Sequence, residues 1–305
     1  MNLTFRQLKI FEAVARHLSF TRASHELHLT QPAVSMQIKQ LEQAVGLPLF
    51  DHVGKRVYLS DAGREMERYS RSITALLQEA SQVFEDMKGL KHGRLTIAVA
   101  STANYFVTKL LASFCERYPK VTVSLDVTNR EQLLNVLAEN QADLVIMGQP
   151  PDGLDLAEEI FMENPLVVIA SPKHVLSGEK AIPFERLQQE TFLVRERGSG
   201  TRLAMERWFA ENDMVISAPL EMSSSEAIKQ GVEAGLGLGL ISIHTLEMEL
   251  TLKRLVILDV EKFPIQRYWH IVHRKGKRLS LVARAFKEFV LREAQNLLDL
   301  PRVPM

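Results

Sequence analysis

The stretch SFTRASHELHLTQPAVSMQIKQLEQAVG, residues 19–46, decides the fold of the N-terminal part of this chain. We predict two short helices separated by a tight turn. Thr21 is a candidate N-cap for the first helix and Thr30 for the second, because a hydroxyl there can accept a hydrogen bond from a free backbone N–H. Pro32 fits the first turn of the second helix, and Gly46 fits its C-terminal end.

The second of these helices has two distinct faces. Val34, Ile38 and Leu41 recur at helical spacing and predict one buried stripe. The opposite face carries neutral hydrogen-bonding groups, a slim apolar side chain and one cation: Gln31, Ser35, Met36 and Lys39. A helix that reads base edges in the major groove needs this mixture. Spacing alone leaves open an ordinary helical corner of a globular protein.

A short hairpin with a basic tip is predicted after Gly46. Apolar residues at 49–50 and 57–59 flank the segment HVGKR, residues 52–56. Lys55 and Arg56 are expected to contact the DNA backbone, with solvated turn cations as the alternative. The whole chain has 37 Lys plus Arg and 37 Asp plus Glu, but residues 1–60 hold seven basic against four acidic residues. This local excess favours a small phosphate-contacting surface.

The predicted DNA contacts therefore come from both helices and from the hairpin. They are Arg22, Gln31, Pro32, Ser35, Met36, Lys39, Lys55 and Arg56.

Residues 61–90 form a heptad pattern. Apolar residues alternate at spacings of three and four: Met66, Tyr69, Ile73, Leu76, Ala80, Val83, Met87 and Leu90. A long helix with one narrow apolar stripe needs a partner, so the pattern predicts a dimer. Packing of the helix on its own domain is the alternative.

The remainder of the chain alternates between strand and helix patterns. A first βαβαβ set is predicted from strands at 95–99, 121–127 and 144–147 and helices at 106–118 and 131–139. A second set has strands at 165–170 and near 238–242, 254–259 and 268–273, and helices near 203–211 and 224–234, and a last helix covers 279–298. This rhythm is typical of an α/β fold with parallel sheets. We expect two lobes, lobe I at about 91–163 and 269–305 and lobe II at about 164–268.

Loops at strand ends and helix starts are the candidate ligand-binding segments, because ligands of open α/β sheets lie there. The loop at 195–202 has three arginines, one acid, two glycines and two hydroxyls, and so can wrap an anion. A basic loop without a ligand is the alternative. The candidate effector-binding residues are Ser101, Thr102, Asn129, Arg130, Gly148, Arg195, Ser199, Gly200, Thr201 and Arg202.

Other features argue against enzymatic, metal and membrane functions. The single cysteine, Cys115, excludes an intramolecular disulfide and is expected to be a small buried residue. The glycines at 235–239 follow a helix and lead into a strand, the reverse of a dinucleotide fingerprint. No nucleophile elbow or metal-ligand spacing is found, so we expect no catalysis, cofactor or metal. No apolar run is long enough to span a membrane, and we expect a cytoplasmic protein with no membrane partner.

The N-terminal pattern resembles the helix-turn-helix of the LysR-type transcriptional regulators. It rests on Phe20, Ala23, Leu27, Gln31-Pro32-Ala33-Val34-Ser35, Ile38, Leu41-Glu42, Gly46 and Leu49-Phe50. The resemblance implies an N-terminal winged helix-turn-helix at 1–60, a dimerising linker helix at 61–90, and at 91–305 a two-lobed effector domain similar to periplasmic binding proteins.

Within that family, five segments resemble the CbbR regulators of Calvin-cycle (RuBisCO) operons: residues 101–106, 129–130, 147–151, 195–202 and 228–230. Residues 223–226 depart from the subgroup pattern. The resemblance implies a homodimer or homotetramer on a double-stranded DNA operator, and contact with RNA polymerase. It also implies activation by a small anionic metabolite, such as a sugar phosphate (ribulose bisphosphate), phosphoenolpyruvate or NADPH.

Two other functions stay open. One is a LysR-type regulator of another pathway, such as sulfur or nitrogen assimilation or aromatic catabolism. The other is an enzyme or transport-type protein that binds a sugar phosphate in the α/β part. The helix-turn-helix at 1–60 counts against the second, because an enzyme has no need of it.

Overall fold

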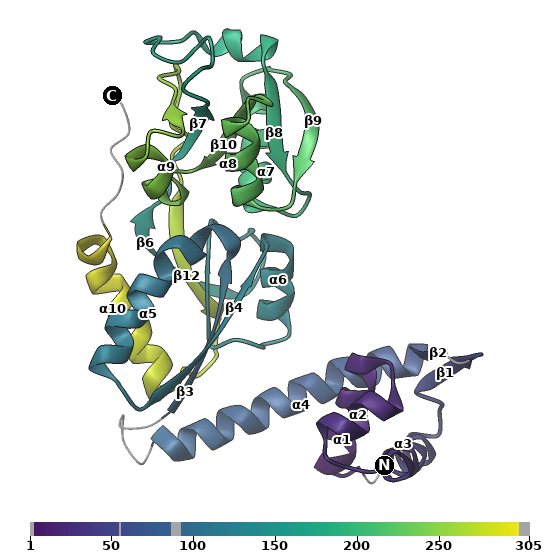
Figure 1. The fold of residues 1–305 in the computed structure, drawn as a ribbon. Helices are drawn as coiled ribbons and strands as arrows, with labels where there is room; N and C mark the ends of the chain where they lie inside the picture. Colours follow the sequence, from purple (N-terminus) through teal and green to yellow (C-terminus); the bar gives the residue numbers. More distant parts are fainter. Residues whose placement is uncertain (1–2, 55, 87–92, 299–305) are drawn as a thin grey trace. The chain divides into compact units, whose positions relative to one another are not determined.

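The computed structural model describes residues 3–54, 56–86 and 93–298 (Figure 1). The chain divides into two compact units, Met1–Phe84 and Glu85–Met305. Each unit is described by itself below. No helix within the described ranges is long and apolar enough to cross a membrane.

The first unit is a winged helix-turn-helix followed by a long helix. Its elements are α1 (Phe5–His17), α2 (Phe20–Glu26), α3 (Gln31–Val45), β1 (Phe50–Val53), β2 (Arg56–Leu59) and α4 (Asp61–Asp86). Strands β1 and β2 form an antiparallel hairpin, the predicted wing. The core includes Phe11, Val14, Val34, Ile38 and Leu41, all nearly inaccessible to solvent. The predicted buried stripe of α3 is therefore confirmed.

The caps of these helices match the prediction with one exception. The Thr30 hydroxyl accepts a hydrogen bond from the Ala33 N–H, and Gly46 ends α3 in the left-handed region at φ 81°. Thr21 is not the N-cap of α2, so that prediction is wrong. The cap is Ser19, whose side chain accepts from the Arg22 N–H, and α2 begins at Phe20. The earlier start places the Phe20 ring 5.7 Å from that of Phe50, where it joins the core.

Two close contacts attach the wing to the helices on either side of it. The Glu42 carboxylate on α3 accepts hydrogen bonds from the Leu49 and Phe50 N–H groups, at 2.8 and 3.3 Å. Gly63 on α4 lies so close to the Leu49 carbonyl that a Cβ would stand 2.0 Å from its oxygen. The orientation of the wing is therefore determined by α3 and α4 together.

Helix α4 exposes part of the predicted heptad stripe. Tyr69, Ile73 and Leu76 have 55, 40 and 63% of their surface accessible, which is high for large apolar side chains. Met66, the first residue of the stripe, instead packs on the core of its own unit. The Val83 side chain, Met87 and Leu90 lie outside the described residues.

Lobe I of the second unit is built on a five-stranded sheet in the order β4-β3-β5-β12-β6. Its strands are β3 (Gly93–Ala100), β4 (Val121–Thr128), β5 (Leu144–Met147), β6 (Leu156–Glu163) and β12 (Tyr268–Arg274). The short turn η1 (Ser101–Ala103) leads into α5 (Asn104–Arg117), and α5 and α10 (Leu281–Leu297) share one apolar core. Helix α6 (Arg130–Ala138) packs on the other face through Leu133 and Leu137. Cys115 in α5 is half-buried rather than buried.

Lobe II has a second five-stranded sheet in the order β11-β7-β10-β8-β9. Its strands are β7 (Leu166–Ala170), β8 (Thr191–Arg195), β9 (Ser217–Met222), β10 (Leu238–Ser242) and β11 (Val256–Ile257). Helix α7 (Gly200–Glu211) packs on one face with the turn η2 (Phe184–Gln189). Helix α8 (Ser225–Glu233), the turn η3 (Ile243–Thr245) and α9 (Glu247–Thr251) cover the other face.

Both sheets are mixed, which corrects the expectation of parallel sheets. Strand β3 pairs in parallel with β4 and β5, but β12 pairs antiparallel with β5 and β6. The α/β class is confirmed. The chain crosses between lobes twice, before β7 and again before β12. At these crossings the Asn164 N–H donates to the Arg267 carbonyl at 2.7 Å, so the two linkers lie side by side.

Candidate functional site

The exposed face of α3 carries the residues predicted to read bases. Gln31, Pro32, Met36 and Lys39 are exposed and Ser35 is half-buried. The Gln31 side-chain amide donates to the Ser35 hydroxyl at 2.8 Å. A polar, nearly uncharged helix face with 54% of Met36 accessible is suited to contact with base edges rather than to a protein core.

Three cations of the first unit surround this face without a carboxylate partner. Arg22, Lys39 and Arg56 are exposed, and among the described residues none has an acidic group within ion-pair distance. Lys55 lies outside the described residues. Arg16 and His17, by contrast, are both paired with Glu26. The unpaired cations are the ones available to DNA phosphates.

A small cavity lies between the two lobes of the second unit. It is lined by nine of the ten predicted effector-binding residues: Ser101, Thr102, Asn129, Arg130, Gly148, Arg195, Ser199, Gly200 and Thr201. These residues come from four separate segments, which fold against the two linkers between the lobes. The free space is about 30 Å³, enough for one or two water molecules.

Arg267 dominates the electrostatics of this cavity. Its guanidinium donates to the Gly200 carbonyl at 3.2 Å, and no ion pair is found for it within the described part of the chain. Burial lowers the pKa of Arg267 to about 10, with further contributions from Arg130 and Arg207. Burial and Arg207 also lower the pKa of Arg130. A group of arginines held near one another without an acid is a site prepared for an anion.

One glycine leaves room for the Arg267 guanidinium. A Cβ at Gly148 would stand 2.4 Å from an Arg267 terminal nitrogen, whereas a Cβ at Gly200 would stand at an ordinary contact distance of 3.9 Å from it. Both glycines, predicted from the sequence as effector contacts, line the cavity. Gly148 also allows the arginine to occupy the wall of the cavity.

Hydroxyl groups and helix N-termini complete the cavity lining. Asn129 caps α6 and Ser199 caps α7, so two helices of nine and twelve residues begin at the cavity wall. Backbone N–H groups at helix starts favour a bound anion. Trp269 is 1% exposed and its indole N–H has no partner among the described residues, so it is a further donor.

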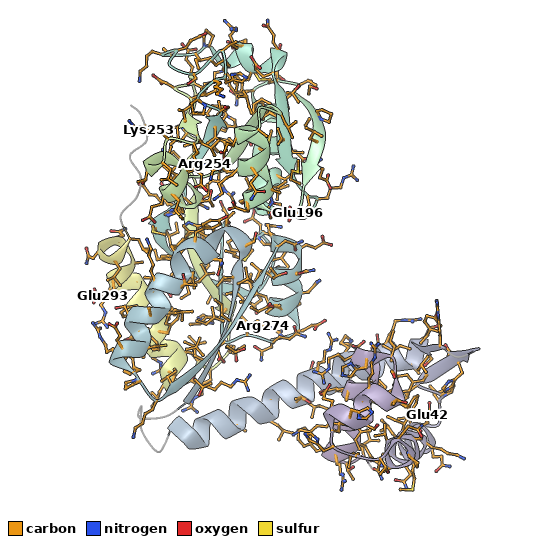
Figure 2. All side chains as sticks on the ribbon, in the orientation of Figure 1. Glu42, Glu196, Lys253, Arg254, Arg274 and Glu293 are labelled. Carbon is orange, nitrogen blue, oxygen red and sulfur yellow. The ribbon has the colours of Figure 1, made fainter. Side chains whose placement is uncertain are left out.

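Arg195 lines the cavity but is already neutralised. Its guanidinium binds both oxygens of Glu196, at 2.7 and 2.9 Å, and donates to the Ser225 and Ser101 hydroxyls. Figure 2 labels Glu196 at the edge of lobe II that faces lobe I. Arg195 therefore connects the lobes more than it offers a free charge.

Arg202 corrects one prediction, because its side chain does not line this cavity. Its guanidinium pairs with Glu206 at 2.7 Å and Glu221 at 2.6 Å, and donates to the Arg195 carbonyl. Position 202 lies on the first turn of α7 and points toward β9. Two acids on that side hold it there, so we remove Arg202 from the candidate site.

The predicted set lacks two apolar residues of the cavity, Ala100 and Met147, and three residues with polar groups, Asn164, Arg267 and Trp269. The three polar residues are the ones that matter for an anion. They lie in or beside the two linkers between the lobes. None stands in a glycine-rich or hydroxyl-rich loop, which was the signal used. An arginine next to a predicted lobe boundary is the only hint that the sequence offered. Among the described residues, no group of three or more His, Cys, Asp or Glu could hold a metal ion.

Comparison with protein families accounts for both units. Residues 5–64 match the family described as "Bacterial regulatory helix-turn-helix protein, lysR family", and residues 88–295 match the "LysR substrate binding domain". The chain is 54% identical to the RuBisCO operon transcriptional regulator of Allochromatium vinosum over 297 residues, 97% of this chain and 98% of that protein. It is 46% identical to the HTH-type transcriptional activator CmpR of Synechocystis over 289 residues, 95% of each.

Solved structures agree with the fold. The CcmR regulatory domain of Synechocystis, in complex with 2-PG, is 42% identical, with a TM-score of 0.65 over 67% of this chain and 99% of that chain. Full-length CbnR complexed with its target DNA is 20% identical, with a TM-score of 0.72 over 95% of this chain and 99% of that chain.

Proposed function

The chain belongs to the LysR family of bacterial transcriptional regulators, and on this basis we propose that it controls a carbon-fixation (RuBisCO) operon in response to a small anionic metabolite. The observation that carries the proposal is the identity to RuBisCO operon regulators, which extends over the DNA-binding and effector-binding parts alike. One of the relatives, CmpR, is an activator, and we propose the same sign of regulation here. The alternative of a sugar-phosphate enzyme is not favoured, because these relatives are transcriptional regulators.

The DNA operator is bound through α3 and the wing in this proposal. Gln31, Ser35 and Met36 contact base edges, and Pro32 sets the entry of the helix into the groove. Arg22, Lys39, Lys55 and Arg56 contact phosphates. The exposure of this face and the absence of acidic partners for its described cations support the assignment.

The effector occupies the cavity between the lobes. The partnerless guanidinium of Arg267, the nearby Arg130 and the hydroxyls of Ser101, Thr102 and Thr201 favour an anion. The related CcmR domain was solved in complex with 2-PG, and we extend that ligand to this chain as one candidate. Phosphoenolpyruvate and ribulose bisphosphate are the others.

The assembly we propose is a dimer through the exposed stripe of α4, paired into a tetramer that contacts RNA polymerase. Tyr69, Ile73 and Leu76 leave a large apolar area on one helix face. Ile73→Asp would place a charge in that seam, where desolvation is unfavourable. Sedimentation should show smaller species and operator affinity should fall. If the variant stays fully assembled, α4 does not form the dimer seam.

The test of function is footprinting of the full-length protein on DNA upstream of a RuBisCO operon, with and without metabolites. We expect specific protection, and a changed protection pattern with 2-PG, phosphoenolpyruvate or ribulose bisphosphate but not with neutral sugars. Protection of promoters of sulfur, nitrogen or aromatic metabolism in place of this one would overturn the carbon-fixation assignment. A response to neutral or aromatic compounds only would overturn the anionic effector.

A further inference from the structure

One face of α5 meets lobe II through three evenly spaced polar contacts. Ser101, Tyr105 and Lys109 lie four residues apart, so they share one side of the η1–α5 segment. The Ser101 hydroxyl accepts from Arg195 at 3.2 Å, the Tyr105 hydroxyl donates to Glu226 at 3.3 Å, and the Lys109 ammonium contacts Glu247 at 2.8 Å. Every one of these contacts joins lobe I to lobe II.

One partner in lobe II, Glu226, is paired with a buried lysine of its own lobe. Lys229 is only 4% exposed, and its ammonium contacts Glu226 at 2.9 Å, Glu249 at 2.6 Å and the Thr245 carbonyl at 3.1 Å. The same ammonium stands 4.9 Å from the centre of the Tyr105 ring. Tyr105 therefore docks on a preformed ion cluster, and little side-chain entropy is lost when it does so.

Only the inner end of this row reaches the effector cavity. Ser101 and Arg195 line the cavity, whereas Tyr105 and Lys109 with their partners do not. Phe106, the residue after Tyr105, also contacts lobe II: its ring centroid lies 5.2 Å from that of the His244 imidazole. The outer contacts can thus be changed without altering the lining of the cavity.

The size of the cavity indicates whether these interlobe contacts favour or oppose ligand binding. The free space between the lobes in this arrangement, about 30 Å³, is enough for one or two water molecules. A phosphorylated acid with several heavy atoms needs several times that volume. Binding therefore requires the lobes to move apart or rotate, and such movement stretches the contacts between α5 and lobe II.

We propose that Tyr105 and Lys109, with Glu226, Lys229 and Glu247, form an interlobe latch that stabilises the narrow cavity and opposes effector binding. The inference rests on the proposed effector site. An effector shifts the regulator only by its difference in affinity for two arrangements. The latch therefore determines how much of the binding free energy is needed to open the lobes. The latch residues are positioning residues: they do not contact the ligand. They change its affinity by stabilising one arrangement of the two lobes.

Two substitutions test the latch without touching the cavity. Tyr105→Phe removes the hydroxyl but keeps the ring over Lys229, and Lys109→Gln removes one ion pair. In full-length protein, calorimetry with 2-PG should show about three- to tenfold tighter binding for the double variant, because less free energy is needed to open the lobes. The footprint without effector should shift toward the pattern that 2-PG produces in the wild type.

Arg254→Gln is the matched control. It breaks the pair between Arg254 and Glu233 of α8, at 2.6 Å, which lies within lobe II and does not reach α5 (Figure 2). This variant should bind 2-PG as the wild type does. An equal gain in affinity for the control would mean that any lost ion pair loosens lobe II, and the latch would be rejected.

Charge reversal gives a second, independent test. Lys109→Glu faces Glu247 with a like charge and should tighten 2-PG binding, and adding Glu247→Lys should restore the wild-type affinity. Unchanged or weaker binding in all latch variants, with an unchanged effector-free footprint, would overturn the latch. If the wild type itself fails to bind 2-PG, phosphoenolpyruvate and ribulose bisphosphate, the effector proposal fails. The effector-free footprints of the variants would then still decide whether the latch exists.

Discussion

The surface formed by α2, α3 and β2 and the cavity between the lobes both present cations that have no acidic partner among the described residues, but the free-energy cost differs. Arg22, Lys39 and Arg56 keep their hydration, so they cost nothing when no DNA is present. Arg267 is desolvated enough for its pKa to fall to about 10, so the empty cavity is electrostatically unfavourable. An anion in the cavity relieves that penalty, whereas a phosphate at the surface only exchanges one set of counterions for another.

DNA binding and effector binding therefore obtain their selectivity from different groups. Surface cations give affinity that any DNA can share, and selectivity must come from the neutral groups of Gln31, Ser35 and Met36. In the cavity the charge of Arg267 gives the selectivity, because a neutral ligand would displace water and leave this partly desolvated cation without a counter-charge.

Arg267→Met should abolish effector binding and leave the DNA-binding unit unaffected. Loss of this half-buried cation should cost at least about 3 kcal/mol, roughly 100-fold or more in effector affinity. Thermal stability without effector should stay equal or rise, because the variant removes a partly desolvated charge that has no acidic partner among the described residues. Calorimetry with phosphorylated acids and a melting curve measure the two effects.

Arg202→Met is its control, because Arg202 is paired with Glu206 and Glu221 away from the cavity. Effector affinity should stay within about twofold of the wild type, a difference well below 1 kcal/mol. A large loss in Arg202→Met, together with full binding in Arg267→Met, would reverse the assignment of the anion-binding arginine.

Gly148→Ala should weaken effector binding by roughly tenfold, about 1.4 kcal/mol. The new Cβ would stand 2.4 Å from an Arg267 nitrogen and push the guanidinium out of place. The displaced group is the end of a flexible side chain, so the melting temperature should change little. In an Arg267→Met background the same substitution should cost nothing more, and an additive loss would show that Gly148 acts by another route.

Gln31→Ala should cost roughly 1–3 kcal/mol at the operator and little on random DNA. Gln37→Ala on the same helix is the matched control, since its amide is bonded to Gln40 and lies off the proposed reading face. Gel-shift titrations on both DNAs measure the ratio. An equal loss on operator and random DNA would contradict base reading by Gln31.

Arg56→Gln should have the smallest and least selective effect. One phosphate contact fewer should reduce the slope of log affinity against log salt by about 0.9, equally for operator and random DNA. Effector affinity should depend less on salt than DNA affinity does, because buried pairs are screened less. If effector affinity fell more steeply with salt than DNA affinity does, the cavity cations would behave as solvated surface charges, contrary to this prediction.

The local elements of this fold could be predicted because their signals lie within a few residues of one another. Thr30, Pro32 and Gly46 predicted both ends of α3, and the apolar runs at 144–147 and 238–242 coincide with β5 and β10. Strand β6 was missed because Glu158, Glu159 and Glu163 give it a polar pattern. It lies at the edge of its sheet, where one side of the strand stays in contact with water.

The sequence alone determined the family, the α/β class and the loops that gather at the cavity, because those depend on local spacing and on motifs. Only the tertiary structure decided which arginine is free. Arg202 stands in the most basic loop but is paired with acids of α7 and β9. Arg267 stands in a featureless linker, yet the distant Gly148 makes room for it and no acid within the described ranges pairs with it. Whether an arginine has an acidic partner depends on which side chains the fold brings within a few ångströms of it. The spacing of residues along the chain does not determine those distances.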